Sequence, residues 1–276
     1  MSVEQQVTAH YTTATLTARI TEGLAALGCD TAHPRAEDLK PVDEFHTGGI
    51  EATEALLDQL DISPATRVLD VGSGLGGTAR HVARRYGAKV MGVDLTPAYV
   101  EAARELSTMA GLSGATRFRE GSATALPVEP ESFDLALMFH VGMNLPDKAA
   151  LFAEVGRALA PGGTFALFDV MRAGEGALSF PLPWSTSEAT SFVEAPAVYH
   201  AAAEAAGFER VAERDRKDFA LHYFERVLAT IAEKGLPPLG IHLLMGETAR
   251  QKMQNYVACV RAGLIAPREM IFRKRA

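Results

Sequence analysis

The sequence is poor in cysteine and has no long hydrophobic run. Its 276 residues include only two cysteines, Cys29 and Cys259, which lie far apart and outside any CxxC spacing. No metal site is expected, and a reducing, cytoplasmic environment is favoured. The longest apolar runs, such as residues 135–139, are far shorter than a membrane span, and the first residues lack a basic stretch followed by an apolar one. We therefore expect neither export nor membrane insertion.

Positive charge is also scarce. Lys and Arg number 27 against 34 Asp and Glu, so the formal net charge is −7 at pH 7. Binding to nucleic acid depends on clustered Lys and Arg that neutralise phosphates. The composition therefore disfavours a nucleic-acid partner, and it leaves a homodimer open.

Strand and helix signals alternate through the middle of the chain. Apolar strands separated by helices indicate a parallel sheet that is covered on both faces. We therefore predict an α/β fold with a doubly wound sheet over residues 52–170. The expected strands are 67–71, 89–93, 116–119, 133–139 and 164–170, and the expected helices are 76–86, 97–110 and 148–160, the last closed by "PGG".

The two ends of the chain are predicted to complete this unit as a cap and as further strands. Residues 1–50 read as an N-terminal helical cap and connector, 51–172 as the ligand-binding core, and 173–276 as cap helices with the last two strands of a mostly parallel seven-stranded sheet. In this last part we expect helices at 195–206, around 223–234 and at 243–262, a strand at 208–216, and an edge strand in the alternating "APREMIFRKR".

A glycine-rich turn follows the first strand. Gly72, Gly74 and the glycines after them fit both GxGxxG and GxGxG, so the glycines alone do not identify the ligand. Asp70 precedes the turn, where a carboxylate would repel a pyrophosphate but suits S-adenosylmethionine, which carries an ammonium and a sulfonium. Asp94 ends the second strand and can accept hydrogen bonds from a ribose diol in either class of ligand.

Four segments taken together resemble the class I S-adenosylmethionine-dependent methyltransferases. These segments are "VLDVGSGLGG", "GVDLTP", "LPVEPESFDLAL" and "EVGRALAPGG", and the resemblance covers residues 52–170. It implies a Rossmann-like methyltransferase fold and S-adenosyl-L-methionine as cofactor. More loosely, "LKPVDEFHTGG", "HYTTATLTARI" and "FPLPW" are similar to the sarcosine/dimethylglycine and phosphoethanolamine N-methyltransferases, including relatives of the ubiquinone and menaquinone type.

The resemblance implies roles for the residues of the cofactor site. The glycine turn lets the backbone approach the methionine part, Asp70 lies near its ammonium, Asp94 accepts the ribose hydroxyls, and Leu95 packs on the adenine. Ser122 and its neighbour stand where many relatives have an Asp-Ala pair. The expected cofactor-binding residues are Asp70, Gly72, Ser73, Gly74, Gly76, Asp94, Leu95, Ser122, Ala123 and His140.

The acceptor side is less defined. His140 follows the fourth strand, where it could contact the cofactor, deprotonate an ammonium substrate as the catalytic base, or serve only the fold. His46 is given a capping role. By resemblance, Arg172 is placed to hold the carboxylate of a glycine-derived substrate; the alternative, slightly favoured, is a solvated charge at the end of a strand. The expected substrate-binding residues are Tyr11, Asn144, Arg172 and Trp184.

The favoured function is methylation of a small-molecule amine of the sarcosine or dimethylglycine kind. O- or C-methylation of a quinone precursor or secondary metabolite is the first alternative. An NAD-dependent oxidoreductase and a non-catalytic nucleoside-binding protein are the alternatives from other classes. A nucleic-acid methyltransferase is disfavoured by the acidic balance and because "FHVGMN" stands where an "NPPY"-like segment would be expected.

Overall fold

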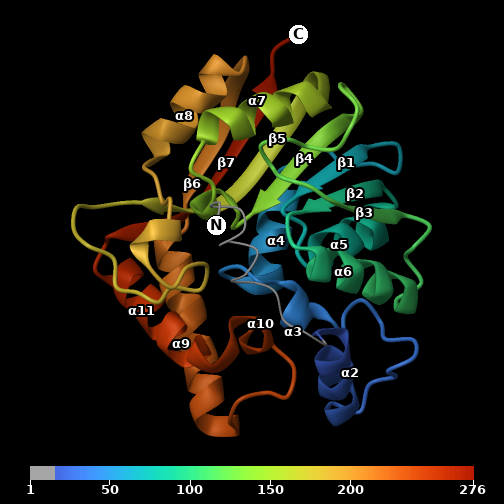
Figure 1. The fold of residues 1–276 in the computed structure, drawn as a ribbon, viewed down its shortest axis with the longest axis vertical. Coiled ribbons are helices and arrows are strands. Elements are labelled where there is room, and N and C mark those ends of the chain that lie inside the picture. The colour runs from blue at the N-terminus through green and yellow to red at the C-terminus, as the bar shows by residue number, and fades with distance from the viewer. Residues whose placement is uncertain (1–15) are drawn as a thin grey trace.

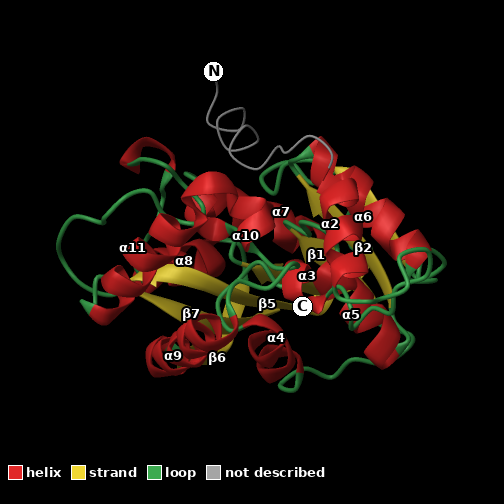
Figure 2. Ribbon diagram, turned by 90° about the horizontal axis from the view of Figure 1, so that it is seen from below, coloured by secondary structure: helices red, strands yellow, loops and turns green. Residues whose placement is uncertain are grey.

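The computed structural model describes residues 16–276, which form a sheet with helices on both sides (Figures 1 and 2). The strands are β1 (Arg67–Val71), β2 (Lys89–Asp94), β3 (Thr116–Glu120), β4 (Phe133–Phe139), β5 (Leu159–Arg172), β6 (Phe208–Asp215) and β7 (Ile265–Lys274). The helices are α2 (Leu16–Ala26), α3 (Lys40–Asp43), α4 (Gly49–Leu57), α5 (Gly77–Tyr86), α6 (Pro97–Met109), α7 (Lys148–Ala158), α8 (Pro196–Ala205), α9 (Lys217–Lys234), α10 (His242–Met245) and α11 (Ala249–Arg261), with short 3-10 turns η1 (Gly142–Asn144), η2 (Glu188–Thr190) and η3 (Gly246–Thr248).

The sheet has seven strands in the order β3-β2-β1-β4-β5-β7-β6. Strands β1 to β5 are parallel to one another, and β7 runs antiparallel to both β5 and β6. The strand order reverses between β1 and β4, whose carboxyl ends lie side by side with Val71 opposite Met138. The predicted doubly wound, mostly parallel seven-stranded fold is thus confirmed.

Two hydrophobic cores cover the two faces of the sheet. On one face, Phe152 of α7 and Tyr199 of α8 pack against strand residues such as Phe165 and Phe272. On the other face, α4, α5 and α6 pack against alternate residues of the same strands, among them Leu137. Because successive strand residues point to opposite faces, strands buried on both faces must be apolar almost throughout. This accounts for the continuous apolar runs in the sequence.

The helices next to the carboxyl edge begin with recognisable signals. Helix α5 starts directly after Gly76, whose φ of 79° lies in the left-handed region. Helix α6 begins at Pro97, where the fixed φ of proline suits a first turn. The side chain of Asp147 accepts a hydrogen bond from the backbone N–H of Ala150 and caps α7. The turns between strands and helices are therefore fixed locally by the sequence.

One strand prediction was wrong. The alternating segment "APREMIFRKR" forms β7, which lies between β5 and β6, so β6 is the edge strand on this side of the sheet. Charged side chains of β7 form ion pairs with the neighbouring strand β6. Glu269 pairs with Arg214, and Arg268 pairs with Glu213 and Asp215. Charged residues that form ion pairs with a neighbouring strand produce the same alternation as a solvent-facing edge.

Several helix boundaries also differ from the predictions, and α9 begins at Lys217 rather than near residue 223. Helix α7 ends at Ala158 rather than Ala160, and "PGG" lies within β5, where the pairing with β4 shifts between Phe133 and Leu135. The single helix expected at 243–262 is broken into α10 and α11 around Gly246, whose φ is 70°. A left-handed glycine ends a helix readily because it has no Cβ.

Several helices outside the central unit gather at one end of the sheet, whereas α8 covers one face of the sheet and β6 and β7 are part of it. Figure 1 shows α2, α3, α10 and the lower part of α9 grouped there, with α11 beside α9. Leu16, Ile20 and Leu24 of α2 are buried together with Tyr99 of α6 and Leu244 of α10. Among the helices formed by residues 16–276, none is long and apolar enough to span a membrane.

Candidate active site

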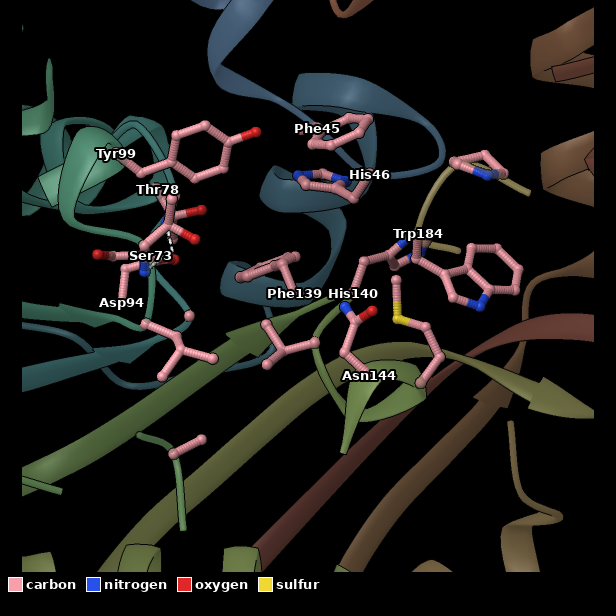
Figure 3. Close-up of a pocket in the computed structure, with 18 of the residues that line it drawn as sticks. Phe45, His46, Ser73, Thr78, Asp94, Tyr99, Phe139, His140, Asn144 and Trp184 are labelled. Carbon is pink, nitrogen blue, oxygen red and sulfur yellow. Dashed lines mark hydrogen bonds between the residues drawn. The ribbon is translucent and has the colours of Figure 1, made fainter. Parts of the chain in front are cut away.

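The reversal of strand order opens a cavity of about 370 Å³ at the carboxyl ends of β1 and β4. Figure 3 shows Ser73, Thr78, Asp94 and Tyr99 on one side of this pocket and Trp184 on the other. His140 and its neighbours lie between the two sides. Open α/β sheets bind ligands at this position because the neighbouring loops diverge there.

Three glycines of the turn after β1 serve different purposes. A Cβ at Gly72 would overlap the side chain of Val141, and a Cβ at Gly76 would come within 2.6 Å of Phe118 Cζ. At Gly74, by contrast, a Cβ would meet nothing within 4 Å, and its φ is +50°. Gly72 and Gly74 both line the pocket, but of these three glycines only Gly74 has open space at the position of a Cβ, so it fits the predicted role of letting a ligand approach the backbone. Gly76 does not line the pocket.

Asp94 ties the glycine turn to the end of β2. One carboxylate oxygen accepts the backbone N–H of Gly74 at 2.8 Å, and the other accepts that of Thr96 at 2.9 Å. Burial raises the pKa of Asp94, and these two hydrogen bonds oppose the rise. The side chain also lines the pocket, where the free lone pairs of its oxygens can accept hydroxyl groups.

Asp70 stands at the floor of the pocket with an exposed fraction of only 2%. Burial, together with the charges of Asp94 and Glu44, raises its pKa to about 7, while a backbone hydrogen bond from Ala79 and the charge of Arg80 oppose the rise. Within residues 16–276, Asp70 Oδ2 and Ser73 Oγ have no hydrogen-bond partner. Buried polar atoms are seldom left unpaired, so these two oxygens fit a ligand with donor groups.

The far end of this half of the pocket is lined by Leu95, Ser122 and Ala123. The hydroxyl of Ser122 lies 2.9 Å from that of Thr124, within a tight turn. The structure therefore brings together all the residues expected to bind the cofactor except Gly76.

His140 is held in a strained backbone conformation at the end of β4. Its φ is 53°, which is uncommon for a residue with a Cβ, and its N–H donates to the carbonyl of Phe168. Burial, with a smaller contribution from His46, holds the pKa of His140 well below 6.5. The ring is therefore neutral at pH 7, and among the described residues its buried Nε2 has no partner.

His46 lies in the pocket wall. The capping role predicted for it did not include a place in the pocket. Its ring is 5.8 Å from that of His140, and its Nε2 lies 2.9 Å from Glu44 Oε2. Glu44 also accepts the hydroxyl of Thr53 and pairs with Lys40. Burial alone would raise the pKa of Glu44, but the hydrogen bond and charge of His46, together with Lys40, lower it overall.

Sequence reasoning assigned no role to Asp169. This buried side chain at the end of β5 accepts the hydroxyl of Tyr199 at 2.7 Å and is also bound by the backbone of Met143. Burial raises its pKa to about 6, while these hydrogen bonds and Lys148 oppose the rise. Asp169 thus fixes the η1 turn that carries part of the pocket wall. The sequence "FDV" could have suggested a role for Asp169, because an acidic residue inside a buried strand needs hydrogen-bond partners.

Two of the four residues expected to bind the acceptor line the pocket. Asn144 and Trp184 line the pocket, and the indole N–H of Trp184 donates to Ser191 Oγ. Arg172 does not line it; its guanidinium donates to the carbonyl of Gly176. Tyr11 lies outside the described residues.

Comparison with known proteins agrees with this site. Residues 69–167 match the methyltransferase domain family. The glycine/sarcosine/dimethylglycine N-methyltransferase of Actinopolyspora halophila is 25% identical over 82% of this chain and 40% of its own length. The tocopherol O-methyltransferase of Arabidopsis thaliana is 33% identical over 56% of this chain and 43% of its own. The geranyl diphosphate C-methyltransferase of Streptomyces coelicolor A3(2) has a similar fold, with a TM-score of 0.72 at 17% identity over 99% of this chain and 98% of its own.

These findings identify residues 69–167 as a methyltransferase domain. The fold of the chain is the Rossmann-like fold of solved methyltransferases, and neighbours of this fold are solved in complex with S-adenosyl-L-methionine or S-adenosyl-L-homocysteine. The resemblance noted from the sequence is confirmed. The chain spans less than half of the length of the two curated relatives named above.

Proposed function

We propose that this protein transfers the methyl group of S-adenosylmethionine to a small molecule bound beside His140. The observation that supports this most is the charge of the pocket. Asp70 and Asp94 line its cofactor side, while none of the described residues that line it is Lys or Arg. Such a lining favours a cationic nucleoside and opposes the pyrophosphate of a dinucleotide. The oxidoreductase alternative is therefore disfavoured.

The residues present fit the cofactor. Asp94 would hold the ribose and Asp70 the ammonium. The part of the pocket wall formed by Leu95, Ser122 and Ala123 would hold the adenine. The bound cofactor supplies a methyl group already activated by its sulfonium. The protein then needs chiefly to align the acceptor and to exclude water.

His140 supplies a polar atom between the cofactor side and the acceptor side in this proposal. Because its pKa lies well below 6.5, the neutral ring can accept a proton or a hydrogen bond at Nε2. The same low pKa makes it a weak base, so it suits an acceptor that arrives uncharged better than an ammonium ion. A positioning role for His140 follows, with proton acceptance only as transfer proceeds.

Transfer to nitrogen was the first expectation, on an acceptor of the sarcosine kind. The relatives named above act by name on nitrogen, oxygen and carbon, so they support a small-molecule methyltransferase without selecting the atom. The carboxylate of sarcosine was assigned to Arg172, which lies outside the pocket. The cytoplasmic location remains part of this proposal.

Calorimetric titration tests the cofactor. S-adenosylmethionine and S-adenosylhomocysteine should each give saturable heat, and NAD(H) and NADP(H) none. Transfer of a labelled methyl group to a panel of amines, phenols and thiols then tests turnover. Heat from a nicotinamide dinucleotide with none from either sulfur nucleoside would refute the proposed function.

A further inference from the structure

The half of the pocket next to His140 is an aromatic chamber, which we define by Met143, Trp184, Tyr223, Phe224, Met253 and Tyr256. Its rings form a continuous series of edge-to-face contacts. Trp184 lies 5.7 Å from Tyr256, Tyr256 lies 5.6 Å from Phe224, and Phe224 lies 5.4 Å from Tyr223. Figure 3 shows Trp184 at the opposite side of the pocket from Asp94.

Polar atoms of the aromatic chamber are largely bound within the protein. The indole N–H of Trp184 donates to Ser191, and the hydroxyl of Tyr256 shares a hydrogen bond of 2.7 Å with that of Thr47. Trp184, Phe224 and Tyr256 therefore offer the faces and edges of their rings to a ligand rather than hydrogen-bonding groups. Surfaces of this kind bind an apolar body by burial.

The cations nearest the chamber have partners elsewhere, and Arg226, which lies 5.8 Å from the centre of the Tyr223 ring, pairs with Glu51. Lys148 donates to the carbonyls of Leu145 and Phe192, and Lys252 donates to the carbonyl of Met245. Residues 1–15, which the structure does not describe, contain no Lys or Arg. Neither the described wall nor that segment can therefore bring a guanidinium or a Lys ammonium to an anionic acceptor.

An anionic acceptor would lose its hydration in this pocket without gaining a countercharge. Burying an unpaired carboxylate costs several kcal/mol. The carboxylates of Asp70 and Asp94 on the cofactor side add repulsion. Each kind of anion, carboxylate or phosphate, meets the same obstacle.

We infer that the methyl acceptor is an uncharged, predominantly apolar molecule that binds in the aromatic chamber. This inference rests on the proposed function. It sets the acceptor apart from amino acids and from phosphate esters, because both carry an anionic group for which the chamber has no partner.

The single tryptophan of the sequence, Trp184, provides a readout that does not depend on turnover. The protein, saturated with S-adenosylhomocysteine, is titrated with matched probes while the Trp184 fluorescence is followed. One pair is 4-methylphenol and 4-hydroxyphenylacetate; a second is N-methylaniline and N-phenylglycine. Sarcosine and phosphoethanolamine, each with and without Mg²⁺, complete the set.

We expect the uncharged member of each pair to bind at least tenfold more tightly than its anionic partner. Met253→Arg adds a cation to the chamber wall and should reduce or reverse this preference, whereas Met253→Leu should retain it. Calorimetry with S-adenosylmethionine on each variant shows whether the cofactor half is intact.

The two proposals fail in different ways. Cofactor binding combined with equal or tighter binding of the anionic probes would overturn the inference and leave the proposed function standing. If no uncharged probe changes the Trp184 fluorescence, the inference is likewise overturned and the proposed function still stands. Loss of cofactor binding by the unmodified protein would instead overturn the proposed function.

Discussion

Replacement of Gly74 by alanine should separate cofactor binding from stability. Gly74 has a φ of +50° and open space around the position of a Cβ. An L-residue in the left-handed region costs about 1–2 kcal/mol, which the reduced entropy of the unfolded chain partly offsets. We therefore expect Gly74→Ala to lower the free energy of unfolding by about 1 kcal/mol, since no atom lies in the way.

Gly111 supplies a matched control. It has a φ of +70° and likewise no atom within 4 Å of a Cβ, but it follows α6 and does not line the pocket. Gly111→Ala should therefore lose about the same stability in urea titrations, roughly 1 kcal/mol. Only Gly74→Ala should weaken S-adenosylmethionine binding in calorimetry, by at least about tenfold, or about 1.4 kcal/mol.

Gly72 gives the opposite contrast. A Cβ there would overlap Val141, so Gly72→Ala should lose more stability than either of the other two variants. Gly74→Ala binding the cofactor as tightly as the unmodified protein would refute the argument that the ligand occupies the open space beside Gly74.

Three further predictions follow from the carboxylates around the pocket. Asp94→Asn should weaken cofactor binding by about 2 kcal/mol in calorimetry, because charge-assisted hydrogen bonds to the ribose are lost; unchanged affinity would place the ribose elsewhere. The pKa of Asp70, raised to about 7 by burial, should make cofactor affinity increase between about pH 6 and pH 8, because the ammonium favours the carboxylate form; Asp70→Asn should abolish this dependence. Because the pKa of Asp70 is raised on folding, the folded protein binds more protons than the unfolded chain between pH 3.8, the ordinary Asp pKa, and about pH 7. The contribution of Asp70 to stability should therefore fall as pH rises through that window, which urea titrations measure. Arg80 and Asp43 form an ion pair in which both side chains are 1% exposed, so Arg80→Met should cost about 3–5 kcal/mol in unfolding experiments. Arg67→Met, which breaks an exposed pair, should cost less than about 1 kcal/mol, and equal losses would contradict the role of burial.

Local patterns in the sequence determined the central sheet and the cofactor half of the pocket. Apolar runs, helix-starting prolines and the glycine turn depend on residues close in the chain, so their structure can be predicted without knowing what packs against them. Asp70 and Asp94 could be placed at the site because each stands at the end of a strand, and parallel strands end at the same edge of the sheet.

Tertiary structure alone decided the acceptor half. Nothing local shows that Trp184, Phe224 and Tyr256 would form one chamber, or that Tyr256 would bind Thr47. The direction of a long side chain is equally undetermined: Arg172 stands at a strand end, as expected, but its guanidinium binds a nearby carbonyl instead of facing the pocket.

The position of β7 has the same physical origin. A period-two pattern shows which residues share a face of a strand, but it does not show whether a charged residue meets water or a partner on the next strand. Arg214 of β6 lies 55 residues before Glu269 in the chain, and only the folded sheet brings the two side chains together. Contacts between residues so distant are chosen by the packing of the whole domain, because no local signal records which distant surface will bury a given side chain.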